Sequence, residues 1–152
     1  MRIRMTELIL IAALLSSAFV SGCGKGKYSS PTKTFEAAWQ ASKNADRVAL
    51  SECFTQASQA ELKAIEQVRK DIPDAPNLPQ SLLDVMIKAA QEGTHAVRNE
   101  TIDGDRATLK VAVNEREQVH RFILEDGQWK IDGAADFVKV RKALELIRNL
   151  KK

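Results

Sequence analysis

The sequence predicts an α+β fold, in which N-terminal helices pack on a curved antiparallel sheet of about four strands and an amphipathic helix ends the chain. Two observations lead to this prediction. Apolar residues recur with the helical period between residues 31 and 92, and they alternate with polar residues, as in a strand, between residues 95 and 132. Helices followed by strands are typical of α+β proteins. The length of 152 residues suits one domain of ordinary size.

The first 22 residues are predicted to be an export signal. Arg2 and Arg4 precede a mainly apolar run of 13 residues, Leu8–Val20. As a helix this run would span roughly 20 Å at about 1.5 Å per residue, which is less than the hydrocarbon core of a bilayer. A basic segment followed by an apolar run of this length is typical of a signal peptide rather than of a membrane span.

The run ends in the segment Val20-Ser21-Gly22-Cys23, of which Val20 is its last apolar residue. These four residues resemble the lipobox of bacterial lipoproteins, in which an apolar residue and two small residues precede a cysteine. The resemblance implies that signal peptidase recognises Val20, Ser21 and Gly22 and removes residues 1–22. Cys23 would then carry acyl chains such as palmitate, and several chains anchor a protein stably in a membrane. The alternatives are an ordinary secretory signal with an incidental cysteine, or a buried core helix.

Residue 24 is Gly rather than Asp. An Asp at this position resembles the inner-membrane retention signal of enteric-type bacteria. Its absence favours the periplasmic face of the outer membrane in a source that has two membranes. The protein is therefore expected in the cell envelope, attached to a membrane through Cys23.

Small and polar residues follow the cysteine and predict a flexible tether over residues 23–30, with a single α+β domain over 31–152. The alternative is that the tether packs as an N-terminal strand. Five helices are predicted in the domain: one from Ser30-Pro31, a short one after Asp46, one capped by Ser58 and Glu61, one from Pro79 to Gly93, and one over 134–151.

Turn signals divide the segment from residue 95 to residue 132 into about four strands of a meander. Asp103-Gly104-Asp105 and Asp126-Gly127 are typical hairpin turns. Between them, Ala107, Leu109 and Val111 alternate with polar residues. This alternation predicts that one face of the sheet is buried.

The helical opening over residues 31–54, the strand over 102–111 and the segment Glu125-Asp-Gly-Gln-Trp-Lys-Ile131 resemble the nuclear transport factor 2-like family of cone-shaped, cystatin-like domains. Small bacterial lipoproteins of unknown function share this layout. The resemblance covers roughly residues 31–132 and implies a cone-like domain. The enzymes of this family are isomerases or dehydratases that place an Asp, His or Tyr inside the cone, and relatives often dimerise across the sheet.

Few residues of this sequence match such chemistry. The one tyrosine, Tyr28, falls in the predicted tether, and the two histidines are His95 and His120. His120 shares a strand face with Phe122 and could enter a cavity, or be a hydrogen-bonded structural residue. There is no phosphate-binding loop, nucleophile elbow or metal-ligand spacing, so we predict no catalytic residue, metal or cofactor.

Bulky side chains nevertheless predict a ligand pocket, or alternatively an ordinary core. The residues predicted for its wall are Phe35, Trp39, Phe54, Met86, His120 and Trp129. The other cysteine, Cys53, is expected to be a buried apolar thiol rather than a nucleophile.

Charge is concentrated at the C-terminus, where residues 134–152 hold six basic and two acidic residues. This helix is expected either to contact anionic lipid or an acidic partner, or to be a solvated face whose cations suit the helix dipole. Nucleic acid is not expected as a partner, because the protein is predicted to be exported and no aromatic residues interleave with the basic ones.

Together these features predict a lipid-anchored envelope protein with a non-catalytic domain that binds a small apolar ligand or another envelope protein. The alternatives are an isomerase-like or dehydratase-like enzyme, and a structural module that assembles as a homodimer.

Overall fold

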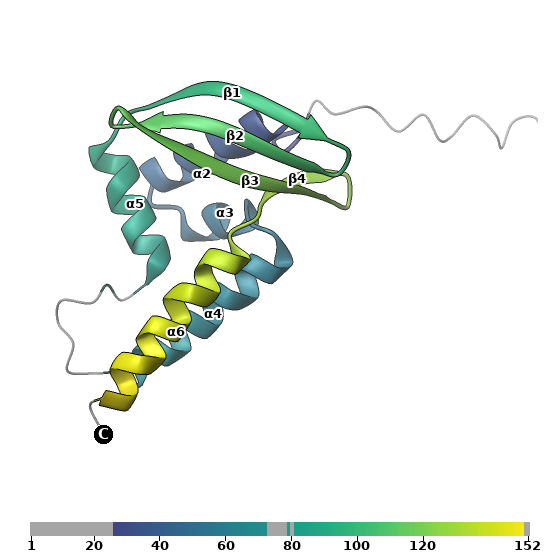
Figure 1. Ribbon diagram of the computed structural model, residues 1–152. Coiled ribbons are helices and arrows are strands. Elements are labelled where there is room, and N and C mark those ends of the chain that lie inside the picture. The colour runs from purple at the N-terminus through teal and green to yellow at the C-terminus, as the bar shows by residue number, and fades with distance from the viewer. Residues whose placement is uncertain (1–25, 73–78, 80, 151–152) are drawn as a thin grey trace, which may run out of the picture.

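The computed structural model describes residues 26–72, 79 and 81–150, and within them the chain forms five helices and a four-stranded antiparallel sheet (Figure 1). In chain order the elements are α2 (Pro31–Lys43), α3 (Arg47–Glu52), α4 (Gln56–Lys70), α5 (Leu82–Glu92), β1 (His95–Asp103), β2 (Arg106–Val113), β3 (Arg116–Glu125), β4 (Gln128–Ile131) and α6 (Ala134–Leu150). The predicted α+β class is confirmed.

The sheet is a meander with the strand order β1-β2-β3-β4, and it curves over α2 and α3 (Figure 1). Tight turns join its strands. Their residues with left-handed backbone are Gly104, Asn114, Glu115, Asp126 and Gly127. Glycine, asparagine and aspartate adopt this backbone more readily than other residues, so two of the turns form at the Asp-Gly sites predicted from the sequence.

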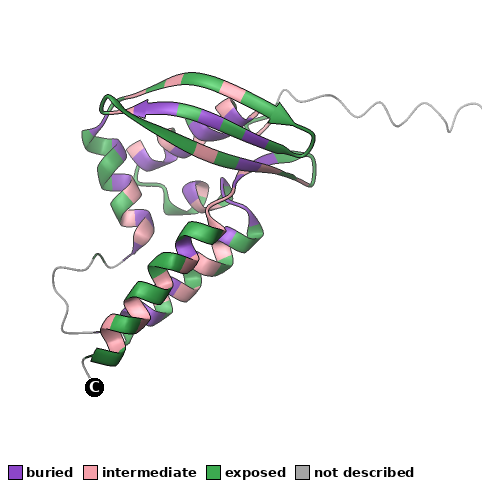
Figure 2. Ribbon diagram, in the orientation of Figure 1, coloured by how far each residue is buried: buried purple, intermediate pink, exposed green. Residues whose placement is uncertain are grey.

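The concave face of the sheet is the buried one. Leu109 and Val111 of β2 have no exposed surface, and Phe122 of β3 is 1% exposed. Intervening residues of β2 are mostly exposed, so buried and exposed residues alternate along this strand (Figure 2). In β3, Phe122 is the one buried residue. The alternation predicted for Ala107, Leu109 and Val111 is therefore confirmed, and it directs these side chains toward the helices.

Helix α2 is fixed at its N-terminus by two side chains. The Ser30 hydroxyl accepts a hydrogen bond from the Lys33 N–H at 3.1 Å. Glu100 of β1 accepts from the N–H and the hydroxyl of Thr32, at 2.8 and 2.6 Å. A carboxylate at this position satisfies a free N–H and interacts favourably with the helix dipole. Glu100 thus connects α2 to the edge of the sheet.

Helices α4 and α6 lie side by side and extend away from the sheet (Figure 1). Leu62 and Ile65 of α4 are buried, and the Phe137 ring at the start of α6 lies 5.6 Å from the Phe54 ring. The buried hydroxyl of Ser58 accepts a hydrogen bond from the Gly133 N–H at 2.9 Å. This bond joins the first turn of α4 to the residue that precedes α6.

Two helix starts differ from the prediction. Helix α4 begins at Gln56 with Thr55 as its N-cap, because the Thr55 hydroxyl accepts from the Ser58 N–H at 3.1 Å. The predicted cap, Ser58, lies inside the helix, and its hydroxyl accepts a hydrogen bond from the Gly133 N–H. Helix α5 begins after the N-cap Ser81 rather than at Pro79.

The segment from Tyr28 to Ser30 belongs to the folded domain, whereas its composition predicted a tether. The Trp129 N–H donates to the Tyr28 carbonyl at 3.0 Å, and the Lys130 ammonium lies 3.9 Å from the centre of the Tyr28 ring. The tyrosine ring supplies apolar surface that the surrounding glycines and serines lack. All core side chains among the described residues lie between Tyr28 and Leu144.

Candidate functional site

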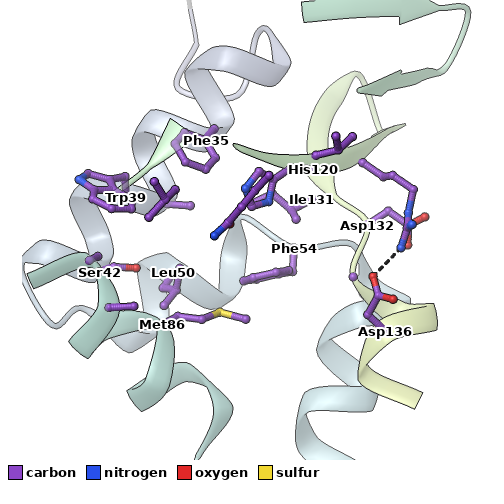
Figure 3. A pocket seen from close by; sticks show the side chains of 18 of the residues that line it. Phe35, Trp39, Ser42, Leu50, Phe54, Met86, His120, Ile131, Asp132 and Asp136 are labelled. Carbon is purple, nitrogen blue, oxygen red and sulfur yellow. Dashed lines mark hydrogen bonds and ion pairs between the residues drawn. The ribbon is translucent and has the colours of Figure 1, made fainter. Parts of the chain in front are cut away.

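A cavity of about 340 Å³ lies between the concave face of the sheet and helices α2, α3 and α5 (Figure 3). This volume is at the lower end of the range for small-molecule sites. Its wall is mostly apolar and includes Leu50, Ile131 and Ala90. The Ser42 hydroxyl of α2 points into it (Figure 3). The cavity is thus suited to a compact, mainly apolar molecule.

The structure brings together five of the six residues predicted for a pocket. Phe35, Trp39, Phe54, Met86 and His120 all line the cavity. Two of them lie in α2, one follows α3, one lies in α5 and one lies in β3. These segments are up to 85 positions apart in the chain.

Trp129 does not line the cavity. It is 7% exposed in β4, where its carbonyl accepts from the Thr34 hydroxyl at 2.8 Å and its N–H donates to Tyr28. These contacts place it in the core beside the N-terminal segment. A tryptophan in a short strand has the same sequence signal whether it packs in a core or lines a pocket, so periodicity did not separate the two.

His120 is the main polar group in the wall of the cavity. Its ring centre lies 5.1 Å from that of Phe35, tilted by 50°. Its Nε2 atom is buried and has no hydrogen-bond partner among the residues described. Burial lowers the pKa of the imidazole below its ordinary value, so the ring is neutral at pH 7.

The inward position of His120 follows from the register of the sheet. His120 pairs with Leu109 of β2, which is fully buried, and Phe122 lies two residues further along β3. Side chains at even spacing on a strand share a face, so His120 has to point toward the helices.

The second histidine, His95, supports the wall from outside. Its ring lies 5.5 Å from Phe35 and 4.5 Å from Trp39. Its Nε2 lies 2.9 Å from a carboxylate oxygen of Glu36, so it has the partner that His120 lacks. His95 is not among the cavity-lining residues. The two histidines thus share an aromatic neighbour but differ in hydrogen bonding.

The mouth of the cavity is polar. Strand β4 pairs with β3 only from Phe122 to Glu125. On that side of β3, the residues from Gln118 to Arg121 have no strand beside them, although β2 pairs with them on the other side. Arg121 and Asp136 lie at this edge and form an ion pair with an N–O distance of 2.6 Å (Figure 3).

Hydrogen bonding to Lys139 and the nearby Arg121 lower the pKa of Asp136. Asp136 therefore stays ionised and keeps Arg121 paired. This pair was not predicted from the sequence. The hairpin turn at Asp126-Gly127 could have indicated it. The register of this hairpin pairs Phe122 with Ile131, so residue 132, which lies just before α6, comes beside Arg121.

The described residues show few groups placed for acid–base chemistry. No carboxylate in them is hydrogen-bonded to Nε2 of His120. Across residues 26–72 and 81–150, no three His, Cys, Asp or Glu side chains come together as metal ligands. Cys53 is fully buried, and burial raises the pKa of its thiol, which disfavours the reactive thiolate.

Most of the basic side chains of α6 that the structure describes form ion pairs. Arg141 pairs with Glu61 of α4 at 2.9 Å and with Glu145 at 2.8 Å. Arg148 pairs with Asp71 at 3.3 Å. Two of the cations of α6 therefore face acidic residues of α4 and its C-terminal end.

No protein-family model, no characterised protein and no solved structure matches this chain. None of the helices described is long and apolar enough to cross a membrane. The predicted signal peptide, including Val20, Ser21 and Gly22, and the predicted lipid site at Cys23 lie outside the described residues.

Proposed function

We propose that this protein is a lipid-anchored envelope lipoprotein whose domain is cone-like and binds a small apolar ligand without catalysing a reaction. The observation that carries the proposal is the apolar cavity under the concave face of the sheet. The anchor rests on Val20-Ser21-Gly22-Cys23 and on the basic and apolar segments before it. A ligand in the cavity would cover the aromatic surface of α2.

Non-catalytic binding agrees with the chemistry of the wall. General acid–base catalysis needs a group whose orientation and pKa are set by a partner. His120 lacks such a partner, and the two aspartates that line the cavity, Asp132 and Asp136, lie at its mouth. A dedicated binding site needs only shape, apolar surface and a few polar atoms.

Mass spectrometry of the protein purified from the membranes of producing cells tests the anchor and the ligand together. The denatured mass should equal residues 23–152 plus the acyl groups, and Cys23→Ala should abolish this addition. An unmodified Cys23 would overturn the anchor. The native mass should show a further small molecule that is lost on denaturation.

Two substitutions on α5 provide a matched control for the cavity. Ala89 lines the cavity at an exposed position, whereas the neighbouring Lys88 does not line it. Ala89→Trp should fill the opening and remove the bound molecule, and Lys88→Trp should leave it. Equal retention by both variants would show that the molecule binds elsewhere.

A further inference from the structure

The unpartnered Nε2 of His120 indicates which ligand the cavity takes. Buried polar atoms in proteins are almost always hydrogen-bonded, so one without a partner needs an explanation. This atom belongs to a residue in the cavity wall, and the neighbouring ring is the apolar Phe35. The imidazole torsion χ2 has a broad range, so the ring can turn toward a bound molecule.

The ligand group that meets His120 should be uncharged. Burial keeps the imidazole neutral, so it offers no charge to balance a carboxylate or an ammonium. Bringing an unpaired charge into an apolar wall is costly. The nearest lining guanidinium, that of Arg121, is already paired with Asp136 at the mouth.

Among uncharged groups, a hydroxyl fits best. A neutral imidazole presents Nε2 either as a donor or as an acceptor, depending on its tautomer. A hydroxyl can accept or donate, so it matches both tautomers, whereas a carbonyl matches only one. The cavity of about 340 Å³ limits the rest of the molecule to a compact apolar body.

We infer that the ligand is a small apolar molecule with one uncharged hydroxyl group, which hydrogen-bonds to Nε2 of His120. This inference rests on the proposed binding function and specifies its ligand class. The hydroxyl is held at the inner wall between Phe35 and β3, and the apolar body fills the space toward Met86.

Three probes of similar shape test the inference by NMR titration of residues 24–152, which include every described core residue. They are 4-propylphenol, 4-propyltoluene and 4-propylbenzoate, which carry a hydroxyl, a methyl and a carboxylate at the same ring position. The indole N–H of Trp39 reports occupancy of the cavity, and the ring nitrogens of His120 report the hydrogen bond. We expect the phenol to bind about tenfold more tightly than the toluene, as for one net hydrogen bond, and the benzoate to bind weakest.

Two histidine variants provide the matched comparison. His120→Phe should keep the ring contact with Phe35 and abolish the preference for the phenol. His95→Phe should leave the preference unchanged, since His95 does not line the cavity. Equal binding of the phenol and the toluene by the unmodified protein would overturn the hydroxyl inference but leave the binding function standing. Failure of all three probes to shift Trp39 would overturn both.

Discussion

At the scale of one residue, replacing His120 with phenylalanine should change ligand preference and folding stability in opposite directions: the preference for a hydroxyl is lost and the stability rises. The variant loses the buried Nε2 that has no partner but keeps an aromatic ring against Phe35. Leaving a buried polar group unsatisfied costs about 1–3 kcal/mol. We therefore expect the free energy of unfolding of His120→Phe at pH 7, measured by urea denaturation, to be about 1 kcal/mol above that of the unmodified protein. A less stable variant would contradict this assignment.

The pH dependence of the same variant gives a second readout. Burial lowers the pKa of folded His120 below the value of about 6.5 that the unfolded chain has. Between these two pKa values the unfolded state binds the proton and the folded state does not, so stability falls as the pH falls below about 6.5, by at most about 1.4 kcal/mol per pH unit. The stability advantage of His120→Phe should widen over this window. A constant difference from pH 7 to pH 5 would contradict the lowered pKa.

At the scale of elements, Glu100 fixes the position of α2 against β1. Its carboxylate accepts two hydrogen bonds from Thr32. We expect Glu100→Ala to lower the free energy of unfolding by about 1–2 kcal/mol, because the variant loses a charged acceptor and a helix-end charge. Urea denaturation followed by circular dichroism measures this loss.

Glu100→Gln serves as the control for this prediction. Glutamine keeps an acceptor for Thr32 but lacks the negative charge, so its loss of stability should be smaller than that of Glu100→Ala. Unchanged stability in both variants would show that the contact with Thr32 contributes nothing to the folded state. Because Phe35 and Trp39 follow on the same helix, a shift of α2 would also alter the wall of the cavity.

Local signals predicted the sheet and placed His120 on the same strand face as Phe122. The Asp-Gly turn at residue 126 and the alternation through Leu109 and Phe122 determine register, and register determines which side chains face the helices. These features depend on neighbours in the chain or on one hairpin. They could therefore be read from the sequence alone.

Features that depend on distant partners could not be predicted this way. Ser58 resembles a helix cap, but its hydroxyl bonds to Gly133, which lies 75 positions away, while Thr55 caps the helix. Trp129 and Tyr28 meet only because the N-terminal segment packs on β4. Tertiary contacts decided each of these cases, and local propensity carried no information about them.

At the scale of the whole molecule, several contacts join the α4–α6 pair to the sheet and to α3. They include the Phe137 ring against Phe54, the ion pair of Asp136 with Arg121 and the ion pair of Glu66 with Arg47. A Cβ atom added at Gly133 would lie 2.7 Å from the Phe137 ring, so this glycine allows the ring to pack over the chain. Phe137 also lines the cavity, which links the position of α6 to the binding site.

Phe137→Ala should therefore weaken both the attachment of the helix pair at Phe54 and the wall of the cavity. Phe137 is 6% exposed, and removing a buried phenylalanine ring costs about 3–5 kcal/mol. In hydrogen exchange, amides of α6 should lose protection before those of β2, because the helix pair loses its main aromatic contact with Phe54 while the sheet keeps its own hydrogen bonds. Leu146→Ala on the same helix is the control, since Leu146 is 66% exposed and should change stability by less than about 0.5 kcal/mol. Simultaneous loss of protection in α6 and β2 would instead show that the helix pair and the sheet unfold as one cooperative unit.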